Sequence, residues 1–267
     1  MKILITGAKG FVGKNLVATL ENIRDGKDRT TALSQEIELF PYDLDTDPAL
    51  LEDWCAKADF VFHLAGVNRP KDNSEFMEGN YGFTSVLLDT LKRHGNACPV
   101  MLSSSIQAQL DNPYGLSKRA GENLLVAHGQ ELGANILIYR FPNLFGKWCR
   151  PNYNSAVATF CYNIAHGLPI TVNDRSVQLT LVYIDDVVQE LLRALQGNET
   201  REGQYCKVPV EHSRHVKGDR QKALCDVSLL STGGGLFVSA ADEHRSPRQL
   251  YGDDPHTGPR PGFRQCF

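Results

Sequence analysis

A short apolar run, followed at once by three regularly spaced glycines, constrains the fold of this chain more than any other feature. The run covers residues 2–6, and Gly7, Gly10 and Gly13 follow it in the segment TGAKGFVG. Apolar residues then recur at helical spacing as far as about Glu21, so the segment predicts a strand, a tight turn and a helix. Such a turn brings backbone N–H groups and the positive end of a helix against a pyrophosphate. We therefore expect a dinucleotide cofactor, and its candidate contacts in the turn are Gly7, Lys9, Gly10, Phe11, Val12 and Gly13.

The choice between NAD and NADP depends on the residues after the second strand, which the pattern places at 36–42. Asp43 stands there and would pair with the 2′-hydroxyl of an adenosine ribose while repelling a 2′-phosphate, which favours NAD. It is also one of three aspartates in a short stretch, so a solvated loop residue is an equally good interpretation. Lys9 could attract a 2′-phosphate instead, and the sequence leaves both NAD and NADP open.

Strands and helices alternate as far as about residue 197. After the first three elements the pattern predicts strands at 59–65, 99–103, 135–139 and 181–184, and helices at 47–57, 83–94, 114–132, 153–167 and 185–197. The strand DFVFHLA at 59–65 is almost continuously apolar, as expected of a strand covered on both faces. This alternation, with short glycine-bearing links, predicts an α/β fold with a Rossmann-type, doubly wound parallel sheet.

The pattern changes after about Gly203. Residues 209–267 show no sustained period of helix or strand, and they contain three consecutive glycines and a Gly/Pro-rich ending. Such a composition buries too little apolar surface to offset the entropy of ordering. We therefore expect residues 1–208 to form a cofactor-binding Rossmann domain with a small, incomplete substrate subdomain, and residues 209–267 to form an aberrant, poorly ordered tail.

Composition excludes several classes of protein. Lys and Arg number 28 against 31 Asp and Glu, a net charge of 28 − 31 = −3, so no nucleic-acid surface is expected. The N-terminal apolar run is too short for a signal peptide, and no stretch of about 18 apolar residues occurs, so we expect a cytoplasmic protein without membrane segments. Seven cysteines without a CxxC pair indicate reduced thiols and no metal site.

A second group of residues suits acid–base chemistry. Tyr114 and Lys118 stand four positions apart in YGLSK, so on a helix they share one face. A lysine ammonium beside a phenol would lower the tyrosine pKa and prepare it for proton transfer. Serines at 103–105 follow a predicted strand about ten residues earlier, where a hydroxyl could bond a substrate carbonyl. The alternative, ordinary surface positions of a helix, is weakened by the glycine turn about 100 residues upstream.

These motifs resemble an extended short-chain dehydrogenase/reductase of the nucleotide-sugar epimerase/dehydratase type. The resemblance covers residues 1 to about 209 and rests on TGAKGFVG, HLAG at 63–66, Asn80 in GNYGFT, SSS at 103–105, YGLSK, RFPNLFG at 140–146 and VYIDDV at 182–187. Within that family the chain is most similar to the capsular polysaccharide reductases of the UDP-N-acetyl-L-fucosamine pathway, through longer segments such as FVFHLAGVNRP, DNPYGLSK and VNDRSVQLTLVYIDD.

The resemblance implies that NADH or NADPH, with NADPH favoured, reduces the C4 ketone of a UDP-2-acetamido-2,6-dideoxy-4-hexulose in surface polysaccharide biosynthesis. Tyr114 would give a proton to the C4 oxygen, and Lys118 would tune it and hold the nicotinamide ribose. Ser105 matches the catalytic serine, with Ser104 as the reserve. The expected cofactor contacts besides the glycine turn and Asp43 are Leu64, Ala65, Gly66, Asn80, Tyr114 and Lys118. The expected contacts to the UDP-sugar are Ser104 and Asn143 and, as weaker candidates, Lys147, Arg150, Asn154 and Arg175.

Two other functions stay open. An epimerase or dehydratase would act on the same keto-sugar, although Ile106 and Gln107 after Ser105 are not the acidic pair that a dehydratase usually carries. An inactive cofactor-binding remnant would result if part of the substrate site is lost. The resemblance also implies a metal-binding cupin domain downstream, which is not legible here, and the sequence from His212 onwards reads like a shifted frame. It further implies a homodimer through the helices that follow Phe83 and contain Tyr114.

Three other groups need an interpretation. We expect His63 to be a strand-end residue bonded to backbone groups rather than a catalytic base. Arg69, in VNRP, could face the substrate. Asp185 and Asp186 favour helix capping over acid–base catalysis.

Overall fold

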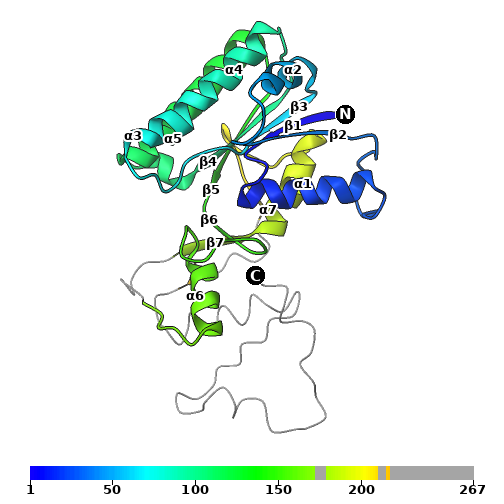
Figure 1. Cartoon of the computed structure of the whole chain (residues 1–267). Coiled ribbons are helices and arrows are strands. Elements are labelled where there is room, and N and C mark those ends of the chain that lie inside the picture. The colour runs from blue at the N-terminus through cyan, green and yellow to red at the C-terminus, as the bar shows by residue number, and fades with distance from the viewer. Residues whose placement is uncertain (172–178, 210–214, 217–267) are drawn as a thin grey trace. The chain divides into compact units, whose positions relative to one another are not determined.

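A computed structural model describes residues 1–171, 179–209 and 215–216 of the chain (Figure 1). The chain divides into two compact units. The first contains residues 1–146 and 182–211, and the second contains residues 147–181 and 212–267. The candidate site lies in the first unit.

The described residues of the first unit form a seven-stranded sheet in the order β2-β1-β3-β4-β5-β9-β8. Every neighbouring pair is parallel except β8 and β9, which are antiparallel. The strands are β1 (Lys2–Thr6), β2 (Glu38–Tyr42), β3 (Phe60–His63), β4 (Val100–Ser105), β5 (Ile136–Phe141), β8 (Arg201–Glu202) and β9 (Tyr205–Cys206). The predicted Rossmann-type parallel sheet is confirmed. Because the strand order reverses between β1 and β3, the carboxyl ends of these two strands mark the point where such sheets bind ligands.

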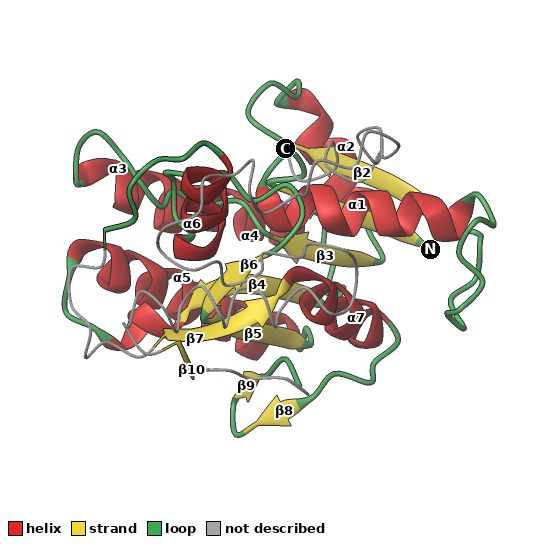
Figure 2. Cartoon of the chain, turned by 90° about the horizontal axis from the view of Figure 1, so that it is seen from below, coloured by secondary structure: helices red, strands yellow, loops and turns green. Residues whose placement is uncertain are grey.

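Helices cover both faces of this sheet (Figures 1 and 2). Ile3 and Ile5 of β1 belong to one core cluster, with α1 (Phe11–Arg24) and α7 (Ile184–Leu195). Leu4 belongs to the other, with α2 (Ala49–Lys57), α4 (Phe83–Arg93) and α5 (Pro113–Leu132). Successive side chains of a strand point to opposite faces, which explains why neighbouring residues of β1 enter different cores. The remaining helical segments of this unit are α3 (Ser74–Phe76), a π-helix (Met77–Gly82) and a 3-10 helix (Ile106–Gln109).

Several elements differ from the sequence expectations. The structure adds the π-helix, β6 (Asn143–Phe145) and the two-residue strands β8 and β9, none of which was predicted. β4 reaches Ser105 rather than ending at 103, so the last serine still belongs to the strand. Strands of two or three residues are too short to show a periodic pattern in the sequence. Their positions depend on the strands with which they pair, as Cys206 of β9 pairs with Tyr139 of β5.

A buried carboxylate holds the end of this unit in place. Glu190 of α7 is only 1% exposed and accepts the Tyr139 hydroxyl at 3.0 Å. It also accepts the backbone N–H of Thr200 at 2.6 Å and the Thr200 hydroxyl at 3.1 Å. A buried charge needs such partners, and these bonds tie the segment that leads into β8 to α7 and β5.

In the second unit, the described residues form α6 (Ala156–Ala165) and a short strand pair. The Ser155 side chain caps α6 by accepting the N–H of Ala158 at 3.4 Å. β10 (His215–Val216) pairs antiparallel with β7 (Leu179–Tyr183). The boundary between the two units falls within β7, after Leu181. The other residues of the predicted tail beyond 209 lie outside the described residues, as does Arg175.

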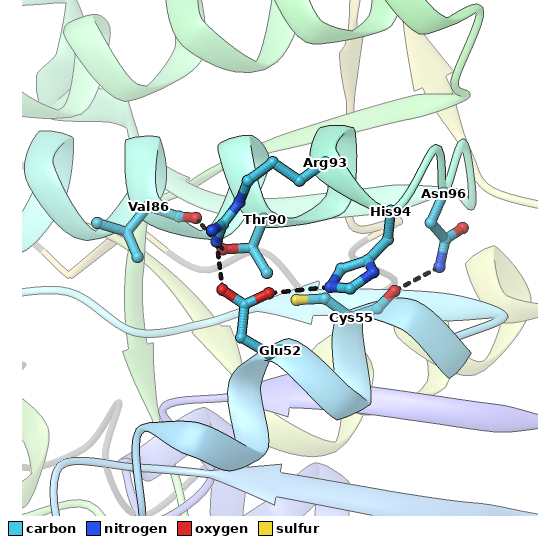
Figure 3. Close-up of polar contacts among 7 residues, drawn as sticks. All are labelled: Glu52, Cys55, Val86, Thr90, Arg93, His94 and Asn96. Carbon is cyan, nitrogen blue, oxygen red and sulfur yellow. Dashed lines mark hydrogen bonds and ion pairs between the residues drawn. The ribbon is translucent and has the colours of Figure 1, made fainter.

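A polar network joins α2 to the C-terminal end of α4 (Figure 3). Glu52 accepts from Arg93, and its Oε2 lies 2.9 Å from Nε2 of His94. Next to this network, the side chain of Asn96 hydrogen-bonds to the backbone. Its Nδ2 donates to the carbonyls of Cys55 at 2.7 Å and Ala58 at 2.9 Å. Its Oδ1 accepts the N–H of Cys98 at 2.9 Å. The Asn96 side chain therefore hydrogen-bonds both to the end of α2 and to the segment just before β4.

We expect Asn96→Ala to lower the free energy of unfolding by about 2–3 kcal/mol, because three hydrogen bonds contribute about 1 kcal/mol each. Urea unfolding, compared with the wild type, measures this loss. Glu52→Gln is the matched control: it disturbs the same network through exposed ion pairs and should cost clearly less. An Asn96→Ala variant as stable as the wild type would contradict this account of the helix end.

Candidate active site

The glycine turn lies at the carboxyl end of β1, where the strand order reverses. Gly7 has φ +70°, and a Cβ there would lie 2.7 Å from the backbone nitrogen of Ala65. A Cβ on Gly13 would lie 2.2 Å from the carbonyl oxygen of Gly7. The first turn of α1 has no acidic residue and its N-cap makes no side-chain hydrogen bond, so neither neutralises the positive potential of the helix N-terminus. The turn therefore has the form of a pyrophosphate cradle.

The candidate ribose contacts lie beside this turn. The backbone N–H of Lys9 donates to Oδ2 of Asp43 at 2.7 Å, so the carboxylate at the end of β2 is held by the turn itself. The Lys9 ammonium forms an ion pair with Asp45. Phe11 and Val12 are half-buried and pack on the core, which leaves their backbone as the part suited to a phosphate. The structure thus brings Lys9 and Asp43 together, with the aspartate fixed and the lysine side chain already paired.

The segment after β3 forms the wall opposite the turn. The N–H of Leu64 donates to the carbonyl of Thr6 at 3.1 Å, which places Leu64, Ala65 and Gly66 beside the glycines. A Cβ on Gly66 would lie 2.7 Å from Oδ1 of Asn80 and 2.9 Å from Nζ of Lys118. Gly66, Asn80 and Lys118 therefore meet at one point, although the sequence separates them by up to 52 positions, 118 − 66.

His63 is a buried neutral residue, but the expectation of backbone partners was wrong. Its Nδ1 lies 2.7 Å from the Thr6 hydroxyl and its Nε2 lies 2.8 Å from the Thr84 hydroxyl. Because the Thr84 hydroxyl donates to the carbonyl of Asn80, it must accept from Nε2–H of His63. Burial and the nearby Lys118 charge lower the His63 pKa to about 3. His63 of β3 therefore links β1 to α4 as a neutral residue.

The candidate catalytic residues meet at the start of α5. The Asn112 side chain caps this helix by accepting the N–H of Gly115 at 2.7 Å, which puts Tyr114 in the first turn and Lys118 one turn later. Lys118 is buried, donates to the carbonyl of Ser103 at 3.2 Å, and has its Nζ 5.9 Å from the centroid of the Tyr114 ring. The structure thus brings the predicted tyrosine and lysine together beside the end of β4.

The pKa of Tyr114 corrects a sequence expectation. Burial raises it, while a hydrogen bond with the Ser105 side chain acts in the opposite direction. The expectation that Lys118 lowers the pKa of Tyr114 is therefore wrong. Burial also lowers the pKa of Lys118 to about 8, with Glu122 opposing the shift. A phenol with a raised pKa keeps its proton at neutral pH, which suits a proton donor.

Adjacent serines at the end of β4 have different surroundings. Ser105 contacts Tyr114 and accepts the N–H of Gln107 at 3.2 Å. The Ser104 hydroxyl is buried and donates to Oε1 of Glu122 at 2.5 Å, and that carboxylate also pairs with Arg140. Alternation along the strand separates the two, so the geometry favours Ser105 and disfavours the reserve, Ser104, as a substrate contact.

The expected substrate contacts are only partly placed by the structure. Asn143 begins β6 in the first unit and is half-buried. Lys147, Arg150 and Asn154 belong to the second unit, and Arg175 lies outside the described residues. Arg69 is exposed in the segment after β3, and Asp185 and Asp186 lie in the first turn of α7. Their roles stay predictions.

Sequence reasoning missed one contact of the tyrosine. The Tyr114 hydroxyl donates to Oδ1 of Asn68 at 2.9 Å. The only signal was the position of Asn68 just beyond a strand end at the point where the strand order reverses. No set of His, Cys, Asp or Glu side chains in the described residues could hold a metal ion. Within that same part of the chain, no helix combines the length and apolarity needed to cross a bilayer.

Comparison with known proteins gives a consistent result. The model of the NAD dependent epimerase/dehydratase family matches residues 3–206. A UDP-2-acetamido-2,6-beta-L-arabino-hexul-4-ose reductase from Pseudomonas aeruginosa is 48% identical over 197 residues, which are 74% of this chain and 50% of the relative. The chain thus spans about half the length of that relative.

Solved structures agree with this comparison. The capsular polysaccharide assembling protein CapF from Staphylococcus aureus superposes with a TM-score of 0.69 at 49% identity, over 80% of this chain and 55% of CapF. A UDP-glucuronic acid 4-epimerase from Bacillus cereus, solved with NAD, gives a TM-score of 0.67 at 21% identity over 89% of this chain and 86% of that one. The second likeness concerns the fold alone.

Proposed function

Because the chain belongs to the NAD dependent epimerase/dehydratase family, we propose that it reduces the C4 ketone of a UDP-2-acetamido-2,6-dideoxy-4-hexulose with NADH or NADPH. The observation that carries the proposal is the meeting of Ser105, Tyr114 and Lys118 beside the glycine turn, in a chain 48% identical to a UDP-hexulose reductase. We also propose that the reaction belongs to surface polysaccharide biosynthesis, which the likeness to CapF supports, and that it takes place in the cytoplasm.

The glycine turn fits a dinucleotide, because a Cβ at Gly7 would collide with the backbone of Ala65 and a Cβ at Gly13 with the backbone of Gly7. The absence of these side chains lets the turn pack closely between the segment after β3 and α1, as a pyrophosphate-binding turn requires. Gly7, Gly10, Gly13 and the wall from Leu64 to Gly66 would hold the cofactor, with Asn80 and Lys118 behind that wall. When bound, NAD(P)H would supply the hydride that reduces C4.

Side chains of the protein would supply the proton for the C4 oxygen and stabilise the negative charge left on Tyr114. Tyr114, whose pKa is raised by burial, would donate its phenol proton to the C4 oxygen. Ser105 would orient that oxygen, because its hydroxyl lies against the phenol. Lys118, with a pKa of about 8, would be mostly charged at neutral pH and would stabilise the phenolate from beneath the ring.

Oxidation of NADH and of NADPH in the presence of the keto-sugar tests the proposal. We expect oxidation that depends on the sugar. Cofactor binding without oxidation of either cofactor would instead support an inactive remnant. Conversion of the sugar without net oxidation would support an epimerase or dehydratase.

Asp43 would disfavour NADPH in this site. We expect Asp43→Asn to lower the KM for NADPH relative to NADH by about threefold or more, because it removes a charge that repels a 2′-phosphate. The amide oxygen can still accept the N–H of Lys9, so the turn is kept. Initial rates with both cofactors give the ratio. Asp47→Asn, farther along the same segment, is the control and should leave the ratio of the two KM values unchanged. If Asp43→Asn also leaves this ratio unchanged, Asp43 does not contact the ribose.

The division of the chain and its oligomeric state complete the proposal. We propose that residues 1–208 carry the cofactor site and part of the substrate site, with residues 209–267 adding little to the reaction. We also propose a homodimer through α4 and α5. Sedimentation of the whole chain tests the dimer, and limited proteolysis tests the division.

A further inference from the structure

The segment after β3 places a neutral amide on the hydroxyl of the candidate proton donor. Tyr114 donates to Oδ1 of Asn68 at 2.9 Å. In the described part of the chain, this is the one hydrogen bond of the Asn68 side chain, which is exposed. The amide can therefore rotate about its Cβ–Cγ bond without losing a second partner.

The backbone that carries this amide is held firmly. Asn80, in the π-helix, accepts the N–H of Val67 at 3.0 Å and donates to the carbonyl of Val67 at 3.1 Å. It also donates to the Ser117 hydroxyl at 3.0 Å, which ties the same amide to α5. On the other side, the ring of Phe76 lies 5.4 Å from that of Tyr114. The residue before Asn68 is thus fixed to the helix that carries the tyrosine.

Proton transfer leaves a negative charge on the Tyr114 oxygen, and the amide of Asn68 can donate a hydrogen bond to it. Once Tyr114 has given up its proton, its oxygen is a phenolate in a partly buried place that disfavours charge. Ser105 contacts the same oxygen but would also face the substrate. Lys118 is the charged group nearby, with Nζ 5.9 Å from the ring centroid. An asparagine can present either its oxygen or its NH₂ group to one neighbour.

We propose that Asn68 is a positioning residue that accepts the hydrogen bond of the Tyr114 hydroxyl before proton transfer and donates its NH₂ to the phenolate afterwards. The inference rests on the proposed function, in which Tyr114 is the proton donor. The Tyr114 hydroxyl turns from Asn68 to the C4 oxygen and gives its proton to that oxygen, while Asn68 changes only its orientation. Hydrogen bonds to a charged acceptor are stronger than neutral ones, so the amide favours the product state.

The pKa of Tyr114, measured by NMR on isotope-labelled tyrosine Cζ, tests this without any turnover. Tyr114→Phe identifies the signal. Asn68→Leu, which is similar in size and cannot hydrogen-bond, should raise the Tyr114 pKa by about one unit, because the phenolate loses its donor. If Asn68 served only as an acceptor for the neutral phenol, its removal would lower the pKa. An equal or lower pKa in Asn68→Leu therefore overturns the inference.

Kinetics supply the second test. Asn68→Asp keeps the size and an acceptor but has no donor, so kcat should fall at least about tenfold while the KM for NAD(P)H stays within about twofold. Asn73→Asp makes the same change at an exposed position in the same segment and should alter neither. Wild-type kcat in Asn68→Asp contradicts the donor role. Absence of turnover in the wild type would refute the proposed function, while the NMR result would still decide the hydrogen-bond role of Asn68.

Discussion

Replacing Tyr114 by Phe should lower kcat by about 100-fold to 1,000-fold, the usual contribution of a positioned general acid. Phenylalanine keeps the ring against Phe76 and over Lys118 but has no proton for the C4 oxygen. The KM for NAD(P)H should change little, because the hydroxyl contacts Asn68 and Ser105 rather than the glycine turn. Steady-state rates of NAD(P)H oxidation with the keto-sugar measure the effect.

A matched control is Tyr81→Phe, which removes the hydroxyl of an exposed tyrosine in the π-helix. Its kcat should equal that of the wild type. If Tyr114→Phe also keeps most of its activity, proton donation by this residue is wrong, and Ser105 or a water molecule must supply the proton.

Gly13→Ala should weaken NAD(P)H binding by about tenfold or more. The added Cβ would lie 2.2 Å from the carbonyl oxygen of Gly7 and 2.8 Å from the Cα of Ala8, both of which are backbone atoms. The turn would have to move away from α1, and overpacking of this kind costs about 1–3 kcal/mol. About 1.4 kcal/mol of that cost in the bound state corresponds to a tenfold loss of affinity. Fluorescence titration with NADPH and NADH, beside a thermal unfolding curve, measures both consequences.

Gly95→Ala separates this effect from general backbone strain. Gly95 has φ +62°, but nothing lies within 4 Å of a Cβ placed there. Its replacement should lower stability by about 1 kcal/mol through the unfavourable φ alone and leave cofactor affinity unchanged. Wild-type affinity in Gly13→Ala would contradict the assignment of the turn as the pyrophosphate cradle.

Local patterns in the sequence were enough to predict most of the fold. The alternation of apolar runs with helical periods predicted β1, β3, α4 and α5 to within a few residues, because each element carries its period within its own length. The pairing of Tyr114 with Lys118 follows from helix geometry alone, and the structure confirms that they are neighbours.

Features that depend on distant partners were not predictable in the same way. The bond between Tyr114 and Asn68 joins residues 46 positions apart. His63 meets Thr6 and Thr84 because three elements converge, and no pattern at 63 announces threonine rather than backbone partners. The raised pKa of Tyr114 likewise reflects burial by the tertiary structure, which outweighs the opposing hydrogen bond with Ser105.

Transfer of an isotope label tests the central claim most directly. The whole chain is incubated with the UDP-2-acetamido-2,6-dideoxy-4-hexulose and with NADPH or NADH carrying deuterium in the transferable position of the nicotinamide ring, and the sugar product is examined by mass spectrometry and NMR. The account predicts one deuterium at C4 of the reduced sugar, in an amount equal to the cofactor oxidised. Recovery of the deuterium in the cofactor, or a sugar that changes without gaining deuterium, would contradict it.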